Sequence, residues 1–596
     1  MKKHTLLLLL FSISHLSSFS QKHDFNWLLG YSTRDNPFDT AWGITKIDFD
    51  TPDGNPLMSY NGNKKIDFHI ACTSISDVYG RYLFSCNGAY IEDSLDQLLK
   101  NSDLLAGNYS YPDDGESTPQ GVLILPYPGF YDKFILFHKE DIFLNDYGIV
   151  SNLLYSVVEF NKQYPTGIMT QKRISLVKDS LDSACLTAVK HANGRDWWVL
   201  VSEDNQISYY VFLLSNTGVQ FVSKQTFPGR KVGGGVGQTF FSNDGKYLAT
   251  ATSDDYLQTR FNNIYFFTFD RCSGILDNLN YIKYPYHDET WATGCSFSPD
   301  NKLFYVVTAD SLYQYSIVDN KLTGKESIAG YDGYTELVIP PDVYWSTWFG
   351  MLQQAPDGRI YGSGFASSCR SIDVINKPNF KGKNCDFRPH SLTTITMKTA
   401  LPSYHNYRLG PIDGSFCDTL GIDNIPWCHW RYDQDTSDYL NFEFTDLSAY
   451  EVTQWSWDFG DPKSDSNESM KKNPNHRFSG NGVYDVTLIV KNSNGSDTLL
   501  RTIKIGNVVS TKDESIILDI QMWPNPCKNY FVVNVLDYNP EKMILHLFNN
   551  LGKELLTQRL YQGSNIFDAG FLSSGEYHIL IHENGKELRT EKLVKL

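Results

Sequence analysis

The sequence is short of basic residues and of long apolar runs. Its 596 residues hold 52 Lys and Arg against 68 Asp and Glu, which leaves a formal net charge of −16. No overall positive potential is therefore available to attract a polyanion, and we expect no nucleic acid partner. Beyond the first twenty residues no window approaches 18 uncharged apolar residues, so we expect no transmembrane segment in the mature chain.

Common enzyme motifs are absent as well. The chain has no GxSxG elbow, no HExxH and no phosphate-binding GxxxxGK loop. The Gly-rich run 233–237 leads into a predicted strand rather than a helix N-terminus. We therefore assign no catalytic residue and no metal-binding residue, and we leave the cofactor unknown, because carboxylates and histidines far apart in sequence can still converge in space.

Cysteine is sparse, with ten residues, all after residue 20. No CxxC occurs, which argues against a compact zinc knuckle. Either disulfides or free buried thiols fit this content. The pairs that are close in sequence suggest loop-closing bridges, with connectivity left open; these disulfide candidates are Cys72 with Cys86, Cys369 with Cys385 and Cys417 with Cys428.

The N-terminus explains why disulfides are expected. Residues 1–20 begin with Lys2 and Lys3, continue with an apolar run over 6–13, and end in small residues before Gln21. This pattern predicts a signal peptide that is cleaved on export.

Aromatic residues are abundant, at 14% of the chain, and a repeated pattern accounts for many of them. A turn with Asp, Asn or Gly recurs before a hydrophobic strand, and successive copies are 49 to 65 residues apart. The six turns are centred on Gly80, Gly129, Gly194, Gly245, Asn301 and Gly358. Asp-Gly and Asn-Gly sequences suit tight turns between two strands.

Repeats of this length favour a β-propeller over residues 22–415, because each small sheet can bury its faces only against neighbouring sheets. Seven blades are the preferred number, with six or eight as alternatives. Residues 27–30, 44–49 and 392–397 are expected to share the blade that closes the ring. A row of separate β-sandwiches is the rival architecture, but no linker composition separates the repeats.

A second module follows a predicted linker at 416–436. Residues 437–507 contain WSWDFGD, then NPNHRF, then GVYDVTL, which alternate as short strands and turns. These motifs closely resemble the PKD (polycystic-kidney-disease) domain, which implies an immunoglobulin-like sandwich. Pro462 departs from the glycine usual in that family. We expect Trp457, His476 and Tyr484 to be core residues, and Asp458 and Asp461 to cap a turn rather than to bind a cation.

The last module is predicted at 515–596, after a short linker at 508–514. Its markers lie in order at the end of the chain and comprise Pro524, Asn525, Pro526, Gly552, Lys553, Gly575 and Tyr577. They resemble the type A C-terminal sorting domain of type IX secretion substrates in Bacteroidota. The resemblance implies recognition by the type IX outer-membrane machinery, and an extracellular or surface-anchored location.

One positional argument identifies candidate ligand-binding residues. Segments at the same offset before the repeat turns should lie on one face of the ring. Two such segments carry aromatic and polar side chains together, as sugar or peptide binding requires. The candidates are Tyr286, His287, Asp288, Glu289, Trp291, Tyr344, Trp345 and Trp348. The alternative is that these rings pack between blades.

The three modules, with residues 186–201 and 402–431, resemble exported Bacteroidota proteins that combine a propeller-like region, a PKD domain and a sorting domain. No reaction follows from that resemblance. The first hypothesis is a non-catalytic binding or adhesion protein with a glycan or protein ligand on the propeller face. The alternatives are an extracellular glycan or peptide hydrolase with its site at the propeller mouth, and a structural component of a surface layer or gliding apparatus.

Overall fold

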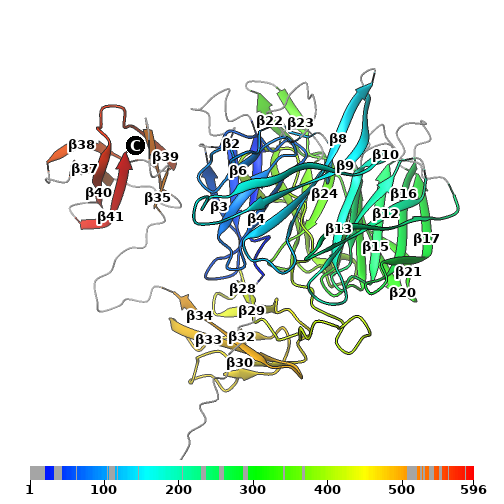
Figure 1. The fold of residues 1–596 in the computed structure, drawn as a ribbon. Helices are drawn as coiled ribbons and strands as arrows, with labels where there is room; N and C mark the ends of the chain where they lie inside the picture. Colours follow the sequence, from blue (N-terminus) through cyan, green and yellow to red (C-terminus); the bar gives the residue numbers. More distant parts are fainter. Residues whose placement is uncertain are drawn as a thin grey trace, which may run out of the picture.

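The fold is all-β, as predicted. The computed structural model describes residues 21–31, 43–61, 64–103, 105, 115–116, 118–144, 147–204, 206–229, 237–253, 261–285, 293–339, 343–364, 369–506, 520–523, 527, 530–535, 543–549, 553–560, 563–583 and 586–595. Within these residues the elements are strands and one short 3-10 helix, η1 (Gly382–Cys385). They form a large N-terminal region and two smaller sandwiches (Figure 1).

Antiparallel sheets follow one another along the N-terminal region. Two three-stranded sheets come first, made of β1 (Asn26–Tyr31), β2 (Gly43–Asp48) and β3 (Leu57–Asn61), and of β4 (Thr73–Ser76), β5 (Tyr82–Cys86) and β6 (Ile91–Asp93). A seven-stranded sheet joins β7 (Val122–Pro126), β8 (Lys133–Leu144), β9 (Tyr147–Glu159), β10 (Ile168–Lys190), β11 (Trp197–Glu203), β12 (Ser208–Ser215) and β13 (Gly218–Thr226). The long strand β10 pairs with β9 in its first half and with β11 in its second.

Three four-stranded sheets and a hairpin complete this region. The sheets are β14 (Gly237–Phe241), β15 (Tyr247–Ser253), β16 (Phe261–Asp270) and β17 (Ile275–Pro285); β18 (Thr293–Phe297), β19 (Leu303–Thr308), β20 (Ser311–Val318) and β21 (Lys321–Gly330); and β24 (Phe349–Gln354), β25 (Ile360–Gly364), β26 (Cys369–Ile375) and β27 (Phe387–Lys398). The hairpin consists of β22 (Thr335–Ile339) and β23 (Val343–Ser346). This arrangement is propeller-like. The number of seven blades stays a prediction, because β10 runs continuously through two groups of strands.

The repeat turns form as predicted. All six central residues have a positive φ, between 59° at Asn301 and 88° at Gly80. In two of the turns, Ser242 and Ser298 each donate to the Asp two residues later, at 2.5 and 2.7 Å. Each turn joins the first strand of a group to the second, so the turns share one end of the ring. We call this end the turn face.

Ring closure differs from the prediction. Strand β27, which contains residues 392–397, pairs with β26 and not with β1 or β2. The two ends of the ring still meet, because the backbone N–H of Thr396 donates to Oγ1 of Thr45 at 3.0 Å. They are thus neighbouring sheets rather than one shared blade.

The chain itself fills the centre of the ring after β27. This central segment, residues 399–410, contacts inner strands of several sheets. Tyr404 donates to the carbonyl of Asn26 in β1, and Tyr407 donates to that of Ile124 in β7, both at 2.9 Å. His405 lies 3.4 Å from Thr187 in β10. Tyr404, His405 and Tyr407 are all buried.

The PKD module is a two-sheet sandwich. One sheet holds β28 (Trp430–Gln434), β29 (Asn441–Asp446) and β32 (Asn475–Arg477), and the other holds β31 (Glu468–Ser469), β30 (Gln454–Asp458), β33 (Gly482–Lys491) and β34 (Ser496–Ile505). Because Trp430 of β28 is fully buried in its core, the sandwich begins inside the predicted linker 416–436.

The core residues of this sandwich match the prediction, and the predicted turn cap is found at one of the two carboxylates. Trp457, His476 and Tyr484 are buried in its core. Asp458 accepts a hydrogen bond from the Gly460 N–H at 2.9 Å, and Asp461 accepts one from the Ser479 N–H at 2.7 Å. Asp458 therefore caps its own turn, whereas Asp461 ties its loop to the segment at Ser479.

The C-terminal module is also a two-sheet sandwich. Its sheets are β35 (Ile520–Trp523), β36 (Tyr530–Val535) and β39 (Gly563–Asp568), and β38 (Glu554–Arg559), β37 (Met543–Asn549), β40 (Gly575–Glu583) and β41 (Lys586–Lys595). Leu545, Phe567 and Ile579 lie in its apolar core.

The predicted cysteine pairs are wrong. The structure joins Cys417 to Cys272, with their Cα atoms 5.7 Å apart. The other candidates are buried free thiols, namely Cys72, Cys86, Cys369, Cys385 and Cys428. Closeness in sequence misled the prediction, because the segment around Cys417 crosses to the β16–β17 turn of the ring before it enters the PKD sandwich.

Candidate functional site

The candidate site is the hairpin β22–β23, which is inserted between the last two four-stranded sheets. It directly precedes β24, the first strand of its sheet, and first strands end at the turn face. The hairpin therefore lies on the opposite face, away from the PKD sandwich (Figure 1).

The strand pairing of the hairpin determines which face of the ribbon each side chain occupies. Leu337 is opposite Tyr344, and Glu336 is opposite Trp345. Since neighbouring residues of a strand point to opposite sides, Tyr344 and Trp345 cover different faces of the ribbon. Tyr344 is 59% exposed and Trp345 is 39% exposed. Large aromatic surface is thus presented to solvent on both sides of one hairpin.

Glu336 anchors the hairpin to the ring. Its carboxylate accepts the backbone N–H groups of Arg370 at 2.7 Å and Ser371 at 2.8 Å, at the start of β26. It also accepts the Ser371 hydroxyl. Charge-assisted hydrogen bonds of this kind hold the ribbon in one orientation.

A second anchor lies at the base of the hairpin. The ring of Tyr334, 45% exposed, stacks on His390 of β27 with centroids 4.2 Å apart. His390 lies between two carboxylates, 3.3 Å from Asp332 and 3.7 Å from Asp373. Burial raises the pKa of Asp373, against the hydrogen bond from the His390 N–H. Burial also opposes ionisation of Asp332, but hydrogen bonds from Tyr334 and His390 outweigh it and lower the pKa of that carboxyl.

The predicted ligand-binding residues divide into two groups. Tyr344, Trp345 and Trp348 lie on or beside the hairpin, and Trp348 is partly buried, with its ring 6.5 Å from that of Tyr331. The other candidates lie outside the described residues, namely Tyr286, His287, Asp288, Glu289 and Trp291.

Sequence reasoning missed Tyr334, Glu336 and His390. Tyr334 and Glu336 lie ten and eight residues before Tyr344, where the predicted segment begins, and a wider window would have included them. His390 carried no signal, because it is 56 residues from Tyr334 in sequence and meets it only through the pairing of β27 in its sheet.

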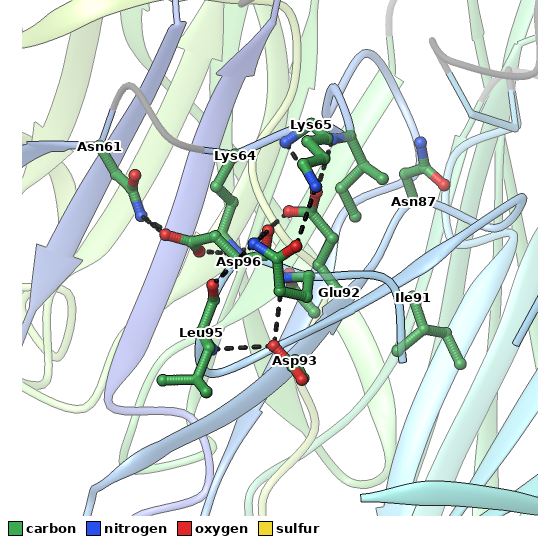
Figure 2. Close-up of polar contacts among 12 residues, drawn as sticks. Asn61, Lys64, Lys65, Asn87, Ile91, Glu92, Asp93, Leu95 and Asp96 are labelled. Carbon is green, nitrogen blue, oxygen red and sulfur yellow. Dashed lines mark hydrogen bonds and ion pairs between the residues drawn. The ribbon is translucent and has the colours of Figure 1, made fainter. Parts of the chain in front are cut away.

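A buried ionic cluster joins the first two sheets (Figure 2). Nζ of Lys64 lies 2.8 Å from Asp96, 3.0 Å from the Tyr82 hydroxyl and 3.3 Å from Glu92. Burial opposes the ammonium form, but these three partners outweigh it and raise the pKa of Lys64. All three ammonium hydrogens have an acceptor, so the cluster is structural and offers no free nucleophile.

The sorting-motif residues that the structure describes stabilise the C-terminal sandwich. The Lys553 N–H donates to Asn549 at 2.9 Å and closes the β37–β38 turn. Gly575 begins β40, and Tyr577 is buried and donates to the Ser573 carbonyl at 2.7 Å. Pro524, Asn525, Pro526 and Gly552 lie outside the described residues.

Comparison with family models confirms the two appended modules. The PKD domain matches residues 432–505, and the secretion system C-terminal sorting domain matches residues 521–596. The chain is therefore exported by type IX secretion to the cell surface or the extracellular space. No curated protein matches the chain. No helix among the described residues has both the length and the apolar character that a membrane crossing needs.

Solved structures resemble separate parts of the chain. The PKD1 domain of Vibrio anguillarum Epp is 22% identical over 14% of this chain and 96% of its own, with a TM-score of 0.13. The periplasmic gluconolactonase PpgL of Pseudomonas aeruginosa is 12% identical over 63% and 97% of the two chains, with a TM-score of 0.34. The Dos1 propeller is 11% identical over 57% and 88%, with a TM-score of 0.30. None of these similarities assigns an activity.

Proposed function

We propose that this type IX secretion cargo is a non-catalytic binding or adhesion protein, and that the hairpin β22–β23 is its recognition surface. The observation that carries the proposal is the exposure of Tyr344 and Trp345 on a ribbon anchored through Glu336. Rigid aromatic side chains contribute large contact area and lose little conformational entropy on binding. A glycan or an extended segment of a surface protein fits such a platform.

The arrangement of the modules supports this role. The central segment fills the ring, and the PKD sandwich contacts the turn face, where Arg431 donates to the Asp357 carbonyl at 2.8 Å. The hairpin on the opposite face points away from these internal contacts (Figure 1). In this proposal the PKD domain is a fixed spacer and the C-terminal domain is the export signal.

The test is a screen of the exported chain on glycan and surface-protein arrays, combined with a hydrolysis assay on every ligand that binds. We expect binding without turnover. The double substitution Tyr344→Ala with Trp345→Ala should weaken binding roughly tenfold or more. Tyr131→Ala is the matched control, because Tyr131 is 79% exposed but lies in the β7–β8 turn on the turn face. Unchanged binding by the double variant, or turnover of the ligand, would overturn the proposal.

A further inference from the structure

A separate cavity of about 280 Å³ lies between the turn face and the PKD sandwich. The repeat turns at Asn243 and Asp300 line it from the ring, and Asn406 lines it from the central segment. The PKD strand end at 445–449 and residues 472–473 form its other wall. Ligand sites are common where two domains meet, and this volume suits a ligand of monosaccharide size.

Six side-chain amides line the cavity, and three of them, from separate elements, each use the oxygen for an internal bond. Oδ1 of Asn379 accepts the Asp300 N–H at 3.0 Å, and Oδ1 of Asn473 accepts the Asp446 N–H at 2.9 Å. Oε1 of Gln354 accepts the amide of Asn243 at 2.9 Å. The oxygens are thereby oriented, and the NH2 group of each amide is left to donate to a ligand.

Among the carboxylates that line the cavity, we assign Asp446 as the complementary acceptor; its Oδ1 already accepts the Ser448 N–H at 3.2 Å. The Asp446 side chain is 2% exposed and lines the cavity, and its charged partner, Lys472, lies 3.9 Å away. Burial raises the pKa of Asp446. The other charges are already paired, since Arg408 forms two bonds with Asp24 at 2.5 and 2.7 Å, and Asp300 lies 3.6 Å from Nζ of Lys302. The cavity is therefore close to neutral and holds both donors and an acceptor.

Apolar groups occupy the remaining wall. Phe241 and Phe297 line the ring side, and Leu447 lines the PKD side. A sugar presents both hydroxyl groups and apolar C–H faces, unlike an anion or a purely apolar ligand. The cavity offers polar groups for the hydroxyls and apolar side chains for the C–H faces.

We infer that this cavity binds a neutral monosaccharide or the terminal sugar of a glycan. The amides of Gln354, Asn379 and Asn473 donate to its oxygens, and the Asp446 carboxylate accepts one of its hydroxyls. Because Asn379 belongs to the ring and Asn473 to the PKD sandwich, the sugar also strengthens the contact between the two domains. The site is independent of the hairpin.

The experiment titrates glucose, galactose, mannose and N-acetylglucosamine, one at a time, into the full exported chain by calorimetry. We expect one sugar to bind with a stoichiometry of one. Asn379→Ala and Asn473→Ala should each weaken its Kd roughly two- to twelvefold, as the loss of one hydrogen bond does. Asn384→Ala and Asn475→Ala are the matched controls, since both asparagines are exposed and lie outside the cavity.

Two variants at separate places in the cavity distinguish loss of the ligand contact from loss of folding. Asn473 also holds the backbone at Asp446, whereas Asn379 contacts the β18–β19 turn, so the two variants cannot fail through the same local defect. Absence of binding by all four sugars, or equal weakening by the control variants, would overturn the inference. Weakening by Tyr344→Ala with Trp345→Ala, and not by the cavity variants, would move the sugar to the hairpin and leave the proposed function standing.

Discussion

The two faces of the ring differ in what they contact. The turn face carries the repeated turns, and it is occupied by the PKD sandwich, the exit of the central segment and the Cys272–Cys417 disulfide. The opposite face carries the hairpin β22–β23, which among the described residues is an insertion between two four-stranded sheets, with exposed Tyr344 and Trp345. The repeated turns thus build the ring and its internal contacts, whereas the surface proposed for recognition is the inserted hairpin on the other face.

The largest expected effect is a loss of stability on the turn face. Arg359 is 9% exposed and connects Asp357 in the ring, at 2.8 Å, with Asp433 in the PKD sandwich, at 2.5 Å. Arg359→Ala leaves the fully buried Asp357 carboxylate without its charged partner, which should cost about 3–5 kcal/mol of unfolding free energy. Denaturant unfolding of the full chain measures this.

Arg388→Ala provides the control for Arg359. The Arg388 side chain is 64% exposed and pairs with Asp386, so its loss should cost at most about 1 kcal/mol. Similar losses for both arginines would contradict the view that the turn face is a buried, fixed junction.

The Cys272–Cys417 disulfide should make the next largest contribution to the stability of the turn face. It ties the β16–β17 turn to the segment that enters the PKD sandwich, and the two cysteines are 145 residues apart in sequence. Cys272→Ser should lower the unfolding free energy by about 2–4 kcal/mol, because the unfolded chain gains conformational freedom. Added reductant should reproduce the loss in the native chain and add nothing in the variant. A further loss in the variant would indicate a second bridge.

Acid should weaken the turn face for a different reason. His23 is buried against Tyr407, and burial lowers its pKa to about 4, although its hydrogen bond with the Ser76 carbonyl opposes this. The unfolded chain binds this proton near pH 6.5, so the stabilisation is complete above that pH and is lost as the pH falls toward 4. We expect His23 alone to contribute about 2–3 kcal/mol to this loss.

The measurement is the unfolding free energy of the native chain and of His23→Phe between pH 7 and pH 4. Phe keeps the aromatic contacts with Phe134 and Tyr407 but does not titrate. The variant should therefore show a shallower decline toward acid. An identical decline would assign the acid sensitivity to other groups.

Much of the fold was predictable because it depends on local sequence. The turns at Gly245 and Asn301 can be predicted from a serine and an aspartate at fixed spacing. The core of the PKD sandwich can be predicted from Trp457 and Tyr484. The central segment was not predictable, because Tyr404 and Tyr407 look like ordinary strand residues until the ring closes around them. The Cys272–Cys417 disulfide was not predicted for the same reason. The disulfide and the central segment both depend on contacts between residues far apart in sequence.

The candidate site shows the same division. Trp345 and Tyr344 were found because aromatic residues cluster in one short segment, whereas His390 stacks on Tyr334 through the register of β27. No sequence motif pointed to the cavity between the turn face and the PKD sandwich. The amides proposed as donors lie at 354 and 379 in the ring and at 473 in the PKD sandwich, so only the docking of the two domains completes the set.

The smallest expected change in stability is the one that defines the opposite face. Trp345 is 39% exposed, and its neighbour across the hairpin, Glu336, keeps its hydrogen bonds to Arg370 and Ser371 when the indole is removed. Because much of the indole is still covered, Trp345→Ala should change the unfolding free energy by about 1–2 kcal/mol. A Trp buried between blades would instead cost about 3–5 kcal/mol. Because the two ranges do not overlap, one denaturation curve decides whether this ring is available to a ligand or is part of the packing of the propeller.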